Sequence, residues 1–545
     1  MRSIPLGNDD FKDIRDNNGY FVDKSMLIEG IVKSPTTKVF LFTKPRRFGK
    51  SLGMSMIDAF FNVRYEGNAW FDDLHVSDCK ECSKERNRYP VIFLNMKNLV
   101  VNDSVSFKKS MAETMESLYQ SYRYLLDSEV LNSDYKEKYR AVTRFDYSKI
   151  SLERTLLNLS EMLRIHHGMQ VIILIDEYDN PIQRTYGTDV QGEVITFMRD
   201  FMSPALESND TLKFGVVTGV MQIAKESIFS GLNNLSTNNV LDKKFDECFG
   251  FTETEVRELI SYYGHPEKFD ECKEWYDGYI FGDEEVYNPW SLLRYIDSGF
   301  EPGRYWAGGS GNDIIGTLLQ TDDRDVYDEL RIMASGGSTN RYVDPFVVYS
   351  DIETKVDVIY SVMVMSGYLK AKRIKDGFEL SIPNKEVFEV YSDMLLSPYG
   401  GDRMAFTIRN LFRSIQAGDV DGITDRVRDL MRSTVSAKIL DSEHAYQTYI
   451  IGMMMGFCGN YEIYGDRLES GDGFADIVFR KIRGPGPNIV MELKRSDSER
   501  DMEKDSESAL RQIIDKDYMH DMSGRTLLYG VAFHSKKSHI VYVDM

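Results

Sequence analysis

The sequence has little of what marks secreted, membrane or disordered proteins. Its 545 residues contain five cysteines and 14 prolines, and they show no repeat or low-complexity tract. The N-terminal segment lacks the apolar core of a signal peptide. No apolar run approaches the ~20 residues that a membrane-spanning helix needs. We therefore expect a globular, cytoplasmic protein without a membrane partner, divided into about two to four domains.

The few cysteines argue against both a disulfide framework and a structural zinc site. Their number is odd, and they are scattered along the chain. Cys79 and Cys82 have the spacing of metal ligands, but no second pair of Cys or His residues follows them. We expect reduced thiols.

Positive charge is also scarce. The 66 Lys and Arg residues are outnumbered by 86 Asp and Glu residues, which gives a net charge of −20. This balance excludes a non-specific affinity for nucleic acid over the whole surface. A local basic patch stays open, and the C-terminal tail holds candidates for it: Lys481, Arg483, Lys494, Arg495, Arg511, Lys536 and Lys537.

The chain does contain a candidate phosphate-binding loop. The apolar run 38–43 is followed by Lys44-Pro-Arg-Arg-Phe-Gly-Lys-Ser51 and then by a helical pattern. A P-loop needs Gly-x4-Gly-Lys-Ser/Thr between a strand and a helix. Gly49, Lys50 and Ser51 match this pattern, whereas Lys44 stands at the first glycine. We expect ATP here, with Lys50 at the phosphates and Ser51 on Mg²⁺; the alternative is a chance match in a basic loop.

A second motif favours the ATP-binding interpretation. Residues 169–175 are apolar throughout, as in a strand buried on both faces of a parallel sheet, and Asp176-Glu177 follows them. Asp176 can serve Mg²⁺, and Glu177 can polarise the water that attacks ATP. The alternative is that both acids only cap a helix. Residues 90–95 and 212–219 predict two further strands of the same sheet.

The C-terminal tail carries two carboxylates and an amine in a pattern that suits metal-assisted hydrolysis. Asp476 precedes an apolar strand, a Gly-Pro-Gly-Pro turn follows, and the next strand holds Glu492-Leu493-Lys494. Residues two apart share a face of a strand, so Glu492 and Lys494 point the same way. We expect Asp476 to meet Glu492 across the hairpin and to bind Mg²⁺ or Mn²⁺ with it and with the carbonyl of Leu493. The alternative is an exposed hairpin with an ordinary ion pair.

The order of elements in the tail is helix, strand, two hairpin strands, helix and strand. In this order, and in the residues Glu443, Tyr446, Glu469 to Asp476, Glu492-x-Lys494 and Gln512, the tail resembles the PD-(D/E)xK nuclease fold in its branch attached to AAA-ATPase-like proteins. The resemblance implies that Glu443 and Gln512 support the nuclease site. Phe474 stands where the family usually has Arg.

The N-terminal half resembles the AAA-ATPase-like family, in which the first loop glycine is routinely a basic residue. The runs that carry this resemblance are Tyr20–Ser25, Pro45–Ser51, Ile175–Asp179, Phe229–Asn234, Trp275–Tyr279 and Tyr287–Ser291. The resemblance implies that Thr218, at the end of an apolar strand, senses the γ-phosphate of ATP; the alternative is an ordinary threonine at a strand end.

Together these patterns predict an α/β multidomain chain. Residues 1–245 form an AAA-ATPase-like P-loop domain, in which helices cover both faces of a parallel sheet. Residues 246–395 form a helical lid or connector, whose aromatic side chains we expect in the core. Residues 396–545 form a restriction-endonuclease-like α/β domain with a preceding helical linker.

These domains predict an ATPase coupled to a metal-dependent nuclease, with ATP, Mg²⁺ or Mn²⁺, and nucleic acid (DNA foremost) as partners. Two alternatives stay open: an ATPase switch with a catalytically silent, nucleic-acid- or protein-binding tail, and an interaction protein in which both sites are relics. Homo-oligomerisation also stays open. The predicted catalytic residues are Glu177, Glu443, Asp476, Glu492, Lys494 and Gln512. The predicted ATP-binding residues are Lys44, Pro45, Arg46, Arg47, Phe48, Gly49, Lys50, Ser51, Asp176 and Thr218. The predicted metal ligands are Ser51, Asp176, Asp476, Glu492 and Leu493.

Overall fold

The computed structural model describes most of the chain. The residues outside the description are 208, 224–234, 307–325, 327–328, 331, 334–335, 348–355, 397–401, 435–441, 455–460, 466–468, 471–472, 483–485 and 519–521. Only the backbone is described for residues 223, 347, 356, 392–396, 402–406, 433–434, 448, 452, 469–470 and 473–474. Among the sequence-based predictions, the run Phe229–Asn234, Arg483, residues 471–472 and the side chains of residues 469–470 and 473–474, which include Phe474, therefore lie outside the described residues.

The chain divides into two compact units. One comprises Met1–Ile315 with Asn340–Val387, and the other comprises Gly316–Thr339 with Phe388–Met545. These units are defined by packing, so the domain boundaries proposed from the sequence at 245 and 395 stay predictions. Along the described residues, no helix combines the length and the apolar character that a membrane span requires.

The first unit is built on a five-stranded parallel sheet. Its strands lie in the order β2-β3-β4-β1-β6. Their bounds are Val91–Asn95 (β2), Val171–Asp176 (β3), Leu212–Gly219 (β4), Val39–Thr43 (β1) and Leu235–Asn238 (β6). Every residue of β1 and β3 is buried, because helices cover both faces of the sheet. The predicted strands and their parallel pairing are confirmed.

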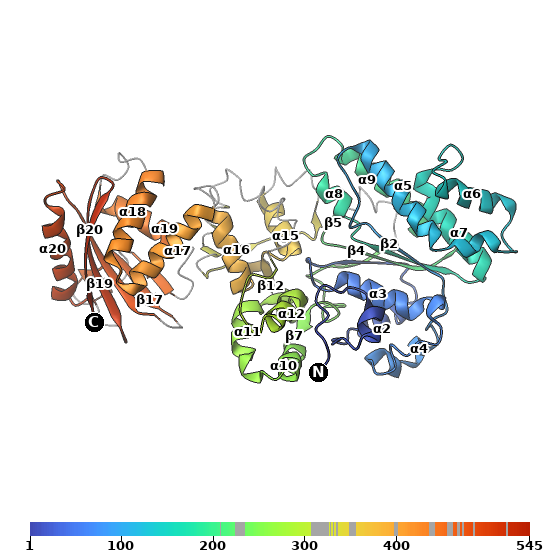
Figure 1. The fold of residues 1–545 in the computed structure, drawn as a ribbon, viewed down its shortest axis with the longest axis horizontal. Coiled ribbons are helices and arrows are strands. Elements are labelled where there is room, and N and C mark those ends of the chain that lie inside the picture. Colours follow the sequence, from blue (N-terminus) through green and yellow to red (C-terminus); the bar gives the residue numbers. More distant parts are fainter. Residues whose placement is uncertain are drawn as a thin grey trace. The chain divides into compact units, whose positions relative to one another are not determined.

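The helices of this unit lie on opposite faces of the sheet (Figure 1). Helix α3 (Lys50–Phe61) packs against β3 and β4 from one side, and α7 (Thr155–His167) and α9 (Gln191–Leu206) pack against them from the other. The chain enters this part through α1 (Phe11–Asp16) and α2 (Met26–Val32), which precede β1. The remaining helices between the strands are α4 (Lys80–Ser83), α5 (Ser104–Gln120), α6 (Ser133–Thr143) and α8 (Asn180–Arg184).

A smaller part of helices and short strands completes the first unit, and the helical lid or connector expected over residues 246–395 stays a prediction. Its helices are α10 (Glu253–Tyr262), α11 (Phe269–Tyr276), α12 (Pro289–Asp297) and α15 (Val356–Ser366), and α16 (Lys385–Leu396) continues into the second unit. Two three-stranded sheets accompany them, β7 (Phe251–Thr252) with β9 (Glu284–Tyr287) and β8 (Tyr279–Phe281), and β10 (Thr339–Arg341) with β13 (Gly377–Ser381) and β12 (Lys370–Ile374). A short pair joins β5 (Gln222–Ile223) to β11 (Phe346–Val347). Thr252 and Glu255 form the capping box that opens α10.

The second unit contains a mixed five-stranded sheet in the order β14-β17-β18-β19-β20. Its strands are Tyr461–Tyr464 (β14), Ile477–Lys481 (β17), Asn488–Arg495 (β18), Thr526–His534 (β19) and Lys537–Asp544 (β20). Strands β18 and β19 are parallel, and every other neighbouring pair is antiparallel. A separate short hairpin consists of β15 (Glu469–Ser470) and β16 (Gly473–Phe474).

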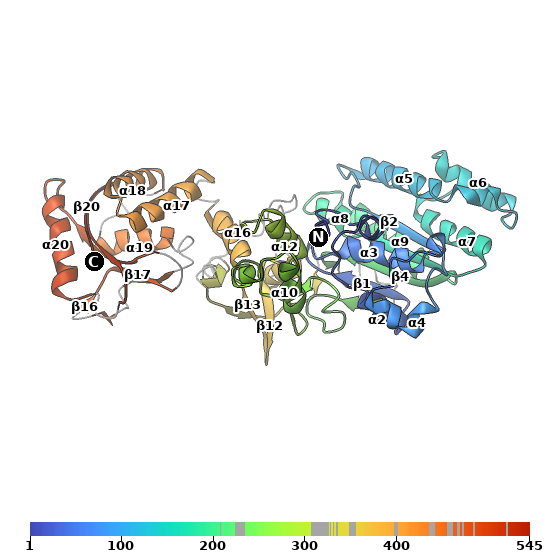
Figure 2. The same cartoon turned by 60° about the horizontal axis from the view of Figure 1, so that its bottom comes forward.

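Helices cover both faces of this second sheet as well. Helix α20 (Met502–Asp515) packs on β18 and β19 from one side (Figure 2). The other face bears α17 (Asp402–Ala417), α18 (Val420–Thr434) and α19 (Glu443–Met454). An apolar core joins these three helices to the sheet, with Leu411, Met431 and Tyr446 packed among residues of β17, β18 and β19. This arrangement is the predicted restriction-endonuclease-like α/β fold.

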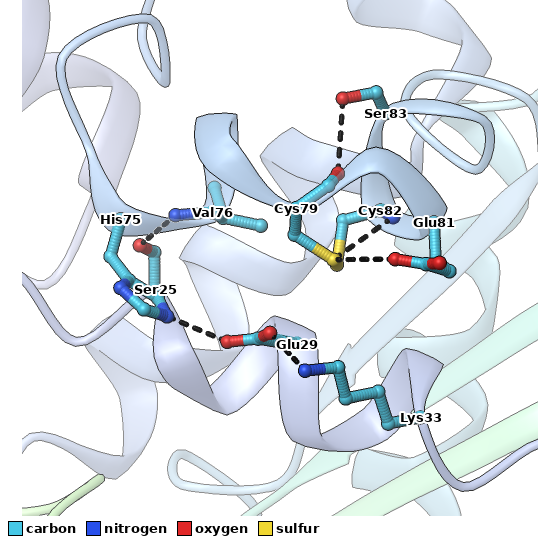
Figure 3. Close-up of a disulfide and its surroundings, with 9 residues drawn as sticks. All are labelled: Ser25, Glu29, Lys33, His75, Val76, Cys79, Glu81, Cys82 and Ser83. Atoms are coloured by element: carbon cyan, nitrogen blue, oxygen red, sulfur yellow. Dashed lines mark hydrogen bonds and ion pairs between the residues drawn. A yellow bond between two sulfur atoms is a disulfide. The ribbon is translucent and has the colours of Figure 1, made fainter.

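One prediction about the cysteines is wrong. Cys79 and Cys82 form a disulfide across α4 (Figure 3), whereas the sequence favoured reduced thiols. Sequence spacing alone could not distinguish these states, because the short turn of α4 brings the two Cα atoms to 5.2 Å, within the range for a disulfide. Cys248 and Cys272 are free and buried.

Candidate functional site

The phosphate loop joins β1 to α3 through a turn that needs glycine. Gly49 has φ of 83° and caps α3, and its position offers open space on the side where a Cβ would stand. The Lys50 ammonium lies back across the loop, where it donates to the carbonyls of Lys44 and Pro45 at 3.0 Å each. The loop therefore already places a cation at the start of α3, where a phosphate would be bound.

Ser51 and residues at the ends of two strands, β2 and β4, converge on the buried carboxylate at the end of β3. Asp176, at the end of β3, accepts hydrogen bonds at Oδ2 from Ser51 Oγ (2.7 Å) and from Asn95 Nδ2 (2.9 Å). Its Oδ1 accepts from the hydroxyl of Thr218 on β4. Burial raises the pKa of Asp176, although Thr218, Ser51 and the charge of Lys50 oppose the shift. The geometry thus brings together three residues that the sequence had selected separately.

Asn95 is the residue of this cluster that sequence reasoning missed. It ends β2, next to β3 in the sheet, and its register partner is Asp176 itself. The signal was available, because the carboxyl ends of neighbouring parallel strands meet at one edge of the sheet.

Glu177 occupies an unusual backbone conformation. Its φ is 56°, in the left-handed region that residues with a side chain rarely adopt. Such a conformation costs on the order of 1 kcal/mol and is maintained by the surrounding structure. Here the amide of the next residue, Tyr178, donates to the carbonyl of Thr218 at 3.0 Å. The half-buried Glu177 is therefore fixed between the ends of β3 and β4.

Several loop residues contact protein groups with their side chains. The Lys44 ammonium is completely buried, donates to the Asn239 carbonyl at 2.8 Å and lies 4.7 Å from the centre of the Phe281 ring. Its backbone amide donates to the carbonyl of Gly219 at 3.2 Å. Burial lowers the pKa of Lys44 to about 8. Both nitrogens of Lys44 thus anchor the loop to its surroundings.

Arg47 and Phe48 attach the loop to the connector. The Arg47 guanidinium donates to the Tyr305 carbonyl at 2.7 Å and lies 4.5 Å from the Trp290 ring. Phe48 is buried against Tyr279 and Phe281, with ring centres 4.9 Å apart in each pair. The connector aromatics therefore pack in the core, as predicted.

The carboxylates of the tail meet at the start of the hairpin. Ile477 of β17 pairs with Met491 of β18, so Asp476 and Glu492 stand opposite each other one step further along the antiparallel pair. Asp476 Oδ2 accepts from the backbone amide of Leu493 at 2.7 Å. The predicted meeting of Asp476 with Glu492 therefore has a direct geometric basis.

Glu492 is held in a nearly closed environment. Its side chain is 4% exposed, Oε1 lies 3.8 Å from the Lys494 ammonium, and Gln512 of α20 also donates to Oε1. Burial first, and the charge of Asp476 second, raise the pKa of Glu492 to about 7, whereas Lys494 lowers it. Its Oε2 is buried and finds no hydrogen-bond partner within the described part of the chain. A buried carboxyl oxygen without a hydrogen-bond partner fits a ligand for a cation, which would favour the ionised form.

Glu443 contacts the backbone next to Lys494. It stands at the start of α19 and accepts from the backbone amide of Arg495, the residue after Lys494, at 3.2 Å. One turn later, Gln447 donates to the carbonyl of Asp476 at 2.6 Å. Sequence reasoning missed Gln447, although the spacing of four residues from Glu443 places both on one helix face.

The donor set for a metal in the tail is small. Along the described residues, no three His, Cys, Asp or Glu side chains gather as ligands for one ion. A cation bound by Asp476 and Glu492 would therefore need further oxygen ligands, which a backbone carbonyl and water can supply.

The fold and these two groups of residues define an α/β protein with a P-loop unit and a nuclease-like unit. Comparison with known families agrees. Residues 5–229 match the family described as "Predicted AAA-ATPase", and residues 441–542 match the PD-(D/E)XK nuclease superfamily. The chain is also 28% identical over 415 residues to an uncharacterized protein in the vnfD 5′ region of Azotobacter chroococcum mcd 1, with 73% of this chain and 70% of the relative covered. The chain thus combines an AAA-ATPase-like domain with a C-terminal PD-(D/E)XK nuclease domain.

Proposed function

We propose that this protein binds and hydrolyses ATP and that it cleaves nucleic acid with its C-terminal domain in a metal-dependent reaction. The observation that carries the nuclease part is the buried Oε2 of Glu492, which has no hydrogen-bond partner among the described residues and lies beside Asp476 and Lys494. The convergence of Ser51 and Thr218 on Asp176 supports the ATPase part.

On the ATP side, Ser51 and Asp176 would hold Mg²⁺, whose charge would offset that of the phosphates. The Lys50 ammonium would give up its hydrogen bonds to the loop carbonyls and donate to phosphate oxygens instead. Glu177 would orient the attacking water and accept its proton. Thr218, which donates a hydrogen bond to Asp176, would sense whether the γ-phosphate is present.

On the nuclease side, Asp476, Glu492 and the carbonyl of Leu493 would hold Mg²⁺ or Mn²⁺, which supplies positive charge at the scissile phosphate and a more acidic water. Lys494 would orient the water or stabilise the charge that develops on the phosphate. Gln512 would keep Glu492 in place through its hydrogen bond to Oε1.

The test is a cleavage assay on the full chain with single-stranded DNA, duplex DNA and RNA, with Mg²⁺ or Mn²⁺ and with or without ATP. Lys50→Ala should lose ATP binding, because the cation at the phosphates is removed while the apolar sheet is untouched. Lys97→Ala, which removes an exposed lysine just after β2, is the matched control. Equal ATP affinity in the two variants would reject the P-loop assignment.

A silent nuclease-like module is the second candidate function. It is favoured by the pKa of Glu492, which at about 7 leaves much of this carboxyl group protonated and weakens its hold on a metal. Calorimetric titration with Mn²⁺ distinguishes the two candidates. A full chain that binds no Mn²⁺ and cuts none of the substrates would establish the silent module.

A further inference from the structure

Asp179, the third acid after β3, has no role in the chemistry proposed above, yet it is completely buried. Its Oδ2 accepts from the backbone amides of Val220 and Met221 at 2.9 Å each. These amides directly follow β4, the strand that carries Thr218. Asp179 therefore ties the end of β3 to the end of β4.

The fit around this carboxylate is close. A Cβ at Gly219 would lie 2.7 Å from Asp179 Oδ1, so only glycine lets the carboxylate sit against β4. Oδ1 itself is buried and finds no hydrogen-bond partner among the residues described. Such an arrangement is expensive for a merely structural contact, since a buried carboxylate oxygen loses its hydration without compensation.

Gln183 extends the contact to the phosphate loop. Its Nε2 donates to Asp179 Oδ2 at 2.6 Å, and its Oε1 accepts from the guanidinium of Arg46 at 3.2 Å. The amide is thus oriented by an acceptor on one side and a donor on the other. A continuous series of hydrogen bonds runs from Arg46, through Gln183 of α8 and Asp179, to the backbone amides that follow β4. We call this series the relay.

The position of Arg46 gives this series a chemical meaning. Arg46 stands in the middle of the loop between Lys44 and Lys50. The backbone of such a loop surrounds the phosphates of a bound nucleotide. The Arg46 guanidinium lies toward α8, the helix that follows Asp176 and Glu177. A guanidinium at this edge can neutralise charge on the γ-phosphate during hydrolysis. The Arg47 side chain contacts the connector through Tyr305 and Trp290, whereas Arg46 meets the connector through its backbone carbonyl, which accepts from Asn288 and Trp306 at 3.4 Å each.

We propose that Arg46 is a catalytic residue that contacts the γ-phosphate of ATP, and that Gln183 and Asp179 are positioning residues that hold it in register with Thr218. This inference rests on the proposed ATPase function. It assigns the side chains of the two adjacent arginines of the loop to different tasks, Arg46 to the nucleotide and Arg47 to the connector.

The first test compares Gln183→Leu with Arg184→Leu in the full chain. Both residues lie on α8, but Arg184 donates to the carbonyl of Leu99 and not to the series. Gln183→Leu should lower kcat by roughly 10-fold to 100-fold with little change in KM, because a misplaced group harms the transition state more than ground-state binding. Arg184→Leu should behave as the parent. Equal kcat values for the two variants would overturn the relay.

The second test uses nucleotide binding, which does not depend on turnover. Arg46→Lys should weaken ATP but leave ADP affinity unchanged, since only ATP has the γ-phosphate. In kinetics, Gln183→Leu added to Arg46→Lys should cost little beyond Arg46→Lys alone, because both act through one contact. Additive losses, or an unchanged ratio of ATP to ADP affinity, would contradict the proposal.

Thermal melts of each variant check that the fold persists, and Gln183→Glu, which keeps the size and the acceptor for Arg46, serves as a second variant. It should retain part of the ATP preference but lose the donor to Asp179. If the parent binds no nucleotide, the proposed ATPase function fails and the relay falls with it. If the parent binds and hydrolyses ATP but the relay variants match Arg184→Leu, only the relay fails.

Discussion

The two candidate sites gather carboxylates at strand ends, but they differ in how these carboxylates are satisfied. Asp176 accepts from two hydroxyls and an amide that come from α3, β2 and β4. Glu492 accepts from Gln512 and lies near Lys494, yet one of its oxygens is buried without a partner among the described residues. The nucleotide site is therefore organised by neutral donors from the fold, whereas the tail site retains an unmet need for positive charge. We therefore expect the removal of a bound metal to affect the tail site more strongly than the nucleotide site.

The largest expected effect comes from removing the acid that faces Glu492. Asp476→Ala should reduce metal-dependent cleavage by about 10³-fold or more, because a metal contributes several kcal/mol to the transition state. ATP hydrolysis should stay largely unchanged, since its residues lie in the other unit. The assay measures both activities on the same preparation.

Asp497→Ala is the matched control for this experiment, because it removes an exposed acid just beyond β18. Cleavage by Asp476→Ala at the rate of this control would place the catalytic acid elsewhere and would remove the basis for comparing the two sites.

A smaller loss is expected at the nucleotide site. Glu177→Gln keeps the size of the side chain and loses its charge, so the variant should bind ATP normally and hydrolyse it about 10²-fold more slowly. Single-turnover measurements separate the two steps. Glu193→Gln, on the exposed side of α9, should hydrolyse ATP as the parent does. Unchanged turnover in Glu177→Gln would assign water activation to another residue.

The unmet charge at Glu492 also predicts a pH dependence. Its pKa is raised to about 7, so below pH 7 a metal must displace a proton from this group. Mn²⁺ affinity of the full chain should rise about fivefold between pH 6 and pH 7, reach about tenfold by pH 8 and then level off. Gln512→Leu removes a donor to the ionised form and should move this profile to higher pH. Calorimetry at several pH values measures both curves, and a flat profile in the parent would mean that Glu492 is already ionised.

The sequence predicted the residues at the proposed nucleotide site more completely than the residues that hold them in place. The strand ends at Asp176 and Thr218 follow from apolar runs that stop at a polar residue, and the loop motif identifies Lys50 and Ser51. The relay through Gln183 could not be predicted, because α8 has five residues and its direction depends on tertiary packing. The buried state of Lys44 was equally hidden, since a basic residue in a phosphate loop suggests a phosphate contact.

In the tail, the sequence predicted the hairpin and the shared face of Glu492 and Lys494, because both depend on local spacing. It missed β20, an edge strand whose alternating polar residues give no apolar run. The elevated pKa of Glu492 also lay beyond sequence reasoning, since burial in the folded domain causes it, with the charge of Asp476 second.

The smallest expected effect concerns a buried acid in the connector. Glu386 is completely buried, and its Oε1 accepts from the backbone amide of Trp306 at 2.5 Å. Burial raises its pKa from 4.5 to about 7, against the Trp306 and Tyr305 amides, Ser291 and the charge of Arg47, which lower it. Between these two pH values the folded protein holds a proton that the unfolded chain has lost. Stability should therefore fall as pH rises from about 4.5 to 7, by roughly 3 kcal/mol, and then stay level.

Glu386→Gln keeps the acceptor for Trp306 but cannot ionise, so it isolates this contribution. The Tm difference between the parent and E386Q should become more unfavourable to the parent as pH rises from 5 to 7, and should change little from 7 to 8. Parallel Tm curves would mean that Glu386 is ionised in the folded protein and is compensated there by Arg47, which donates to the neighbouring Tyr305 carbonyl. Glu386 would then resemble Glu492 as a buried acid that depends on a cation, but here the protein itself supplies the cation, Arg47.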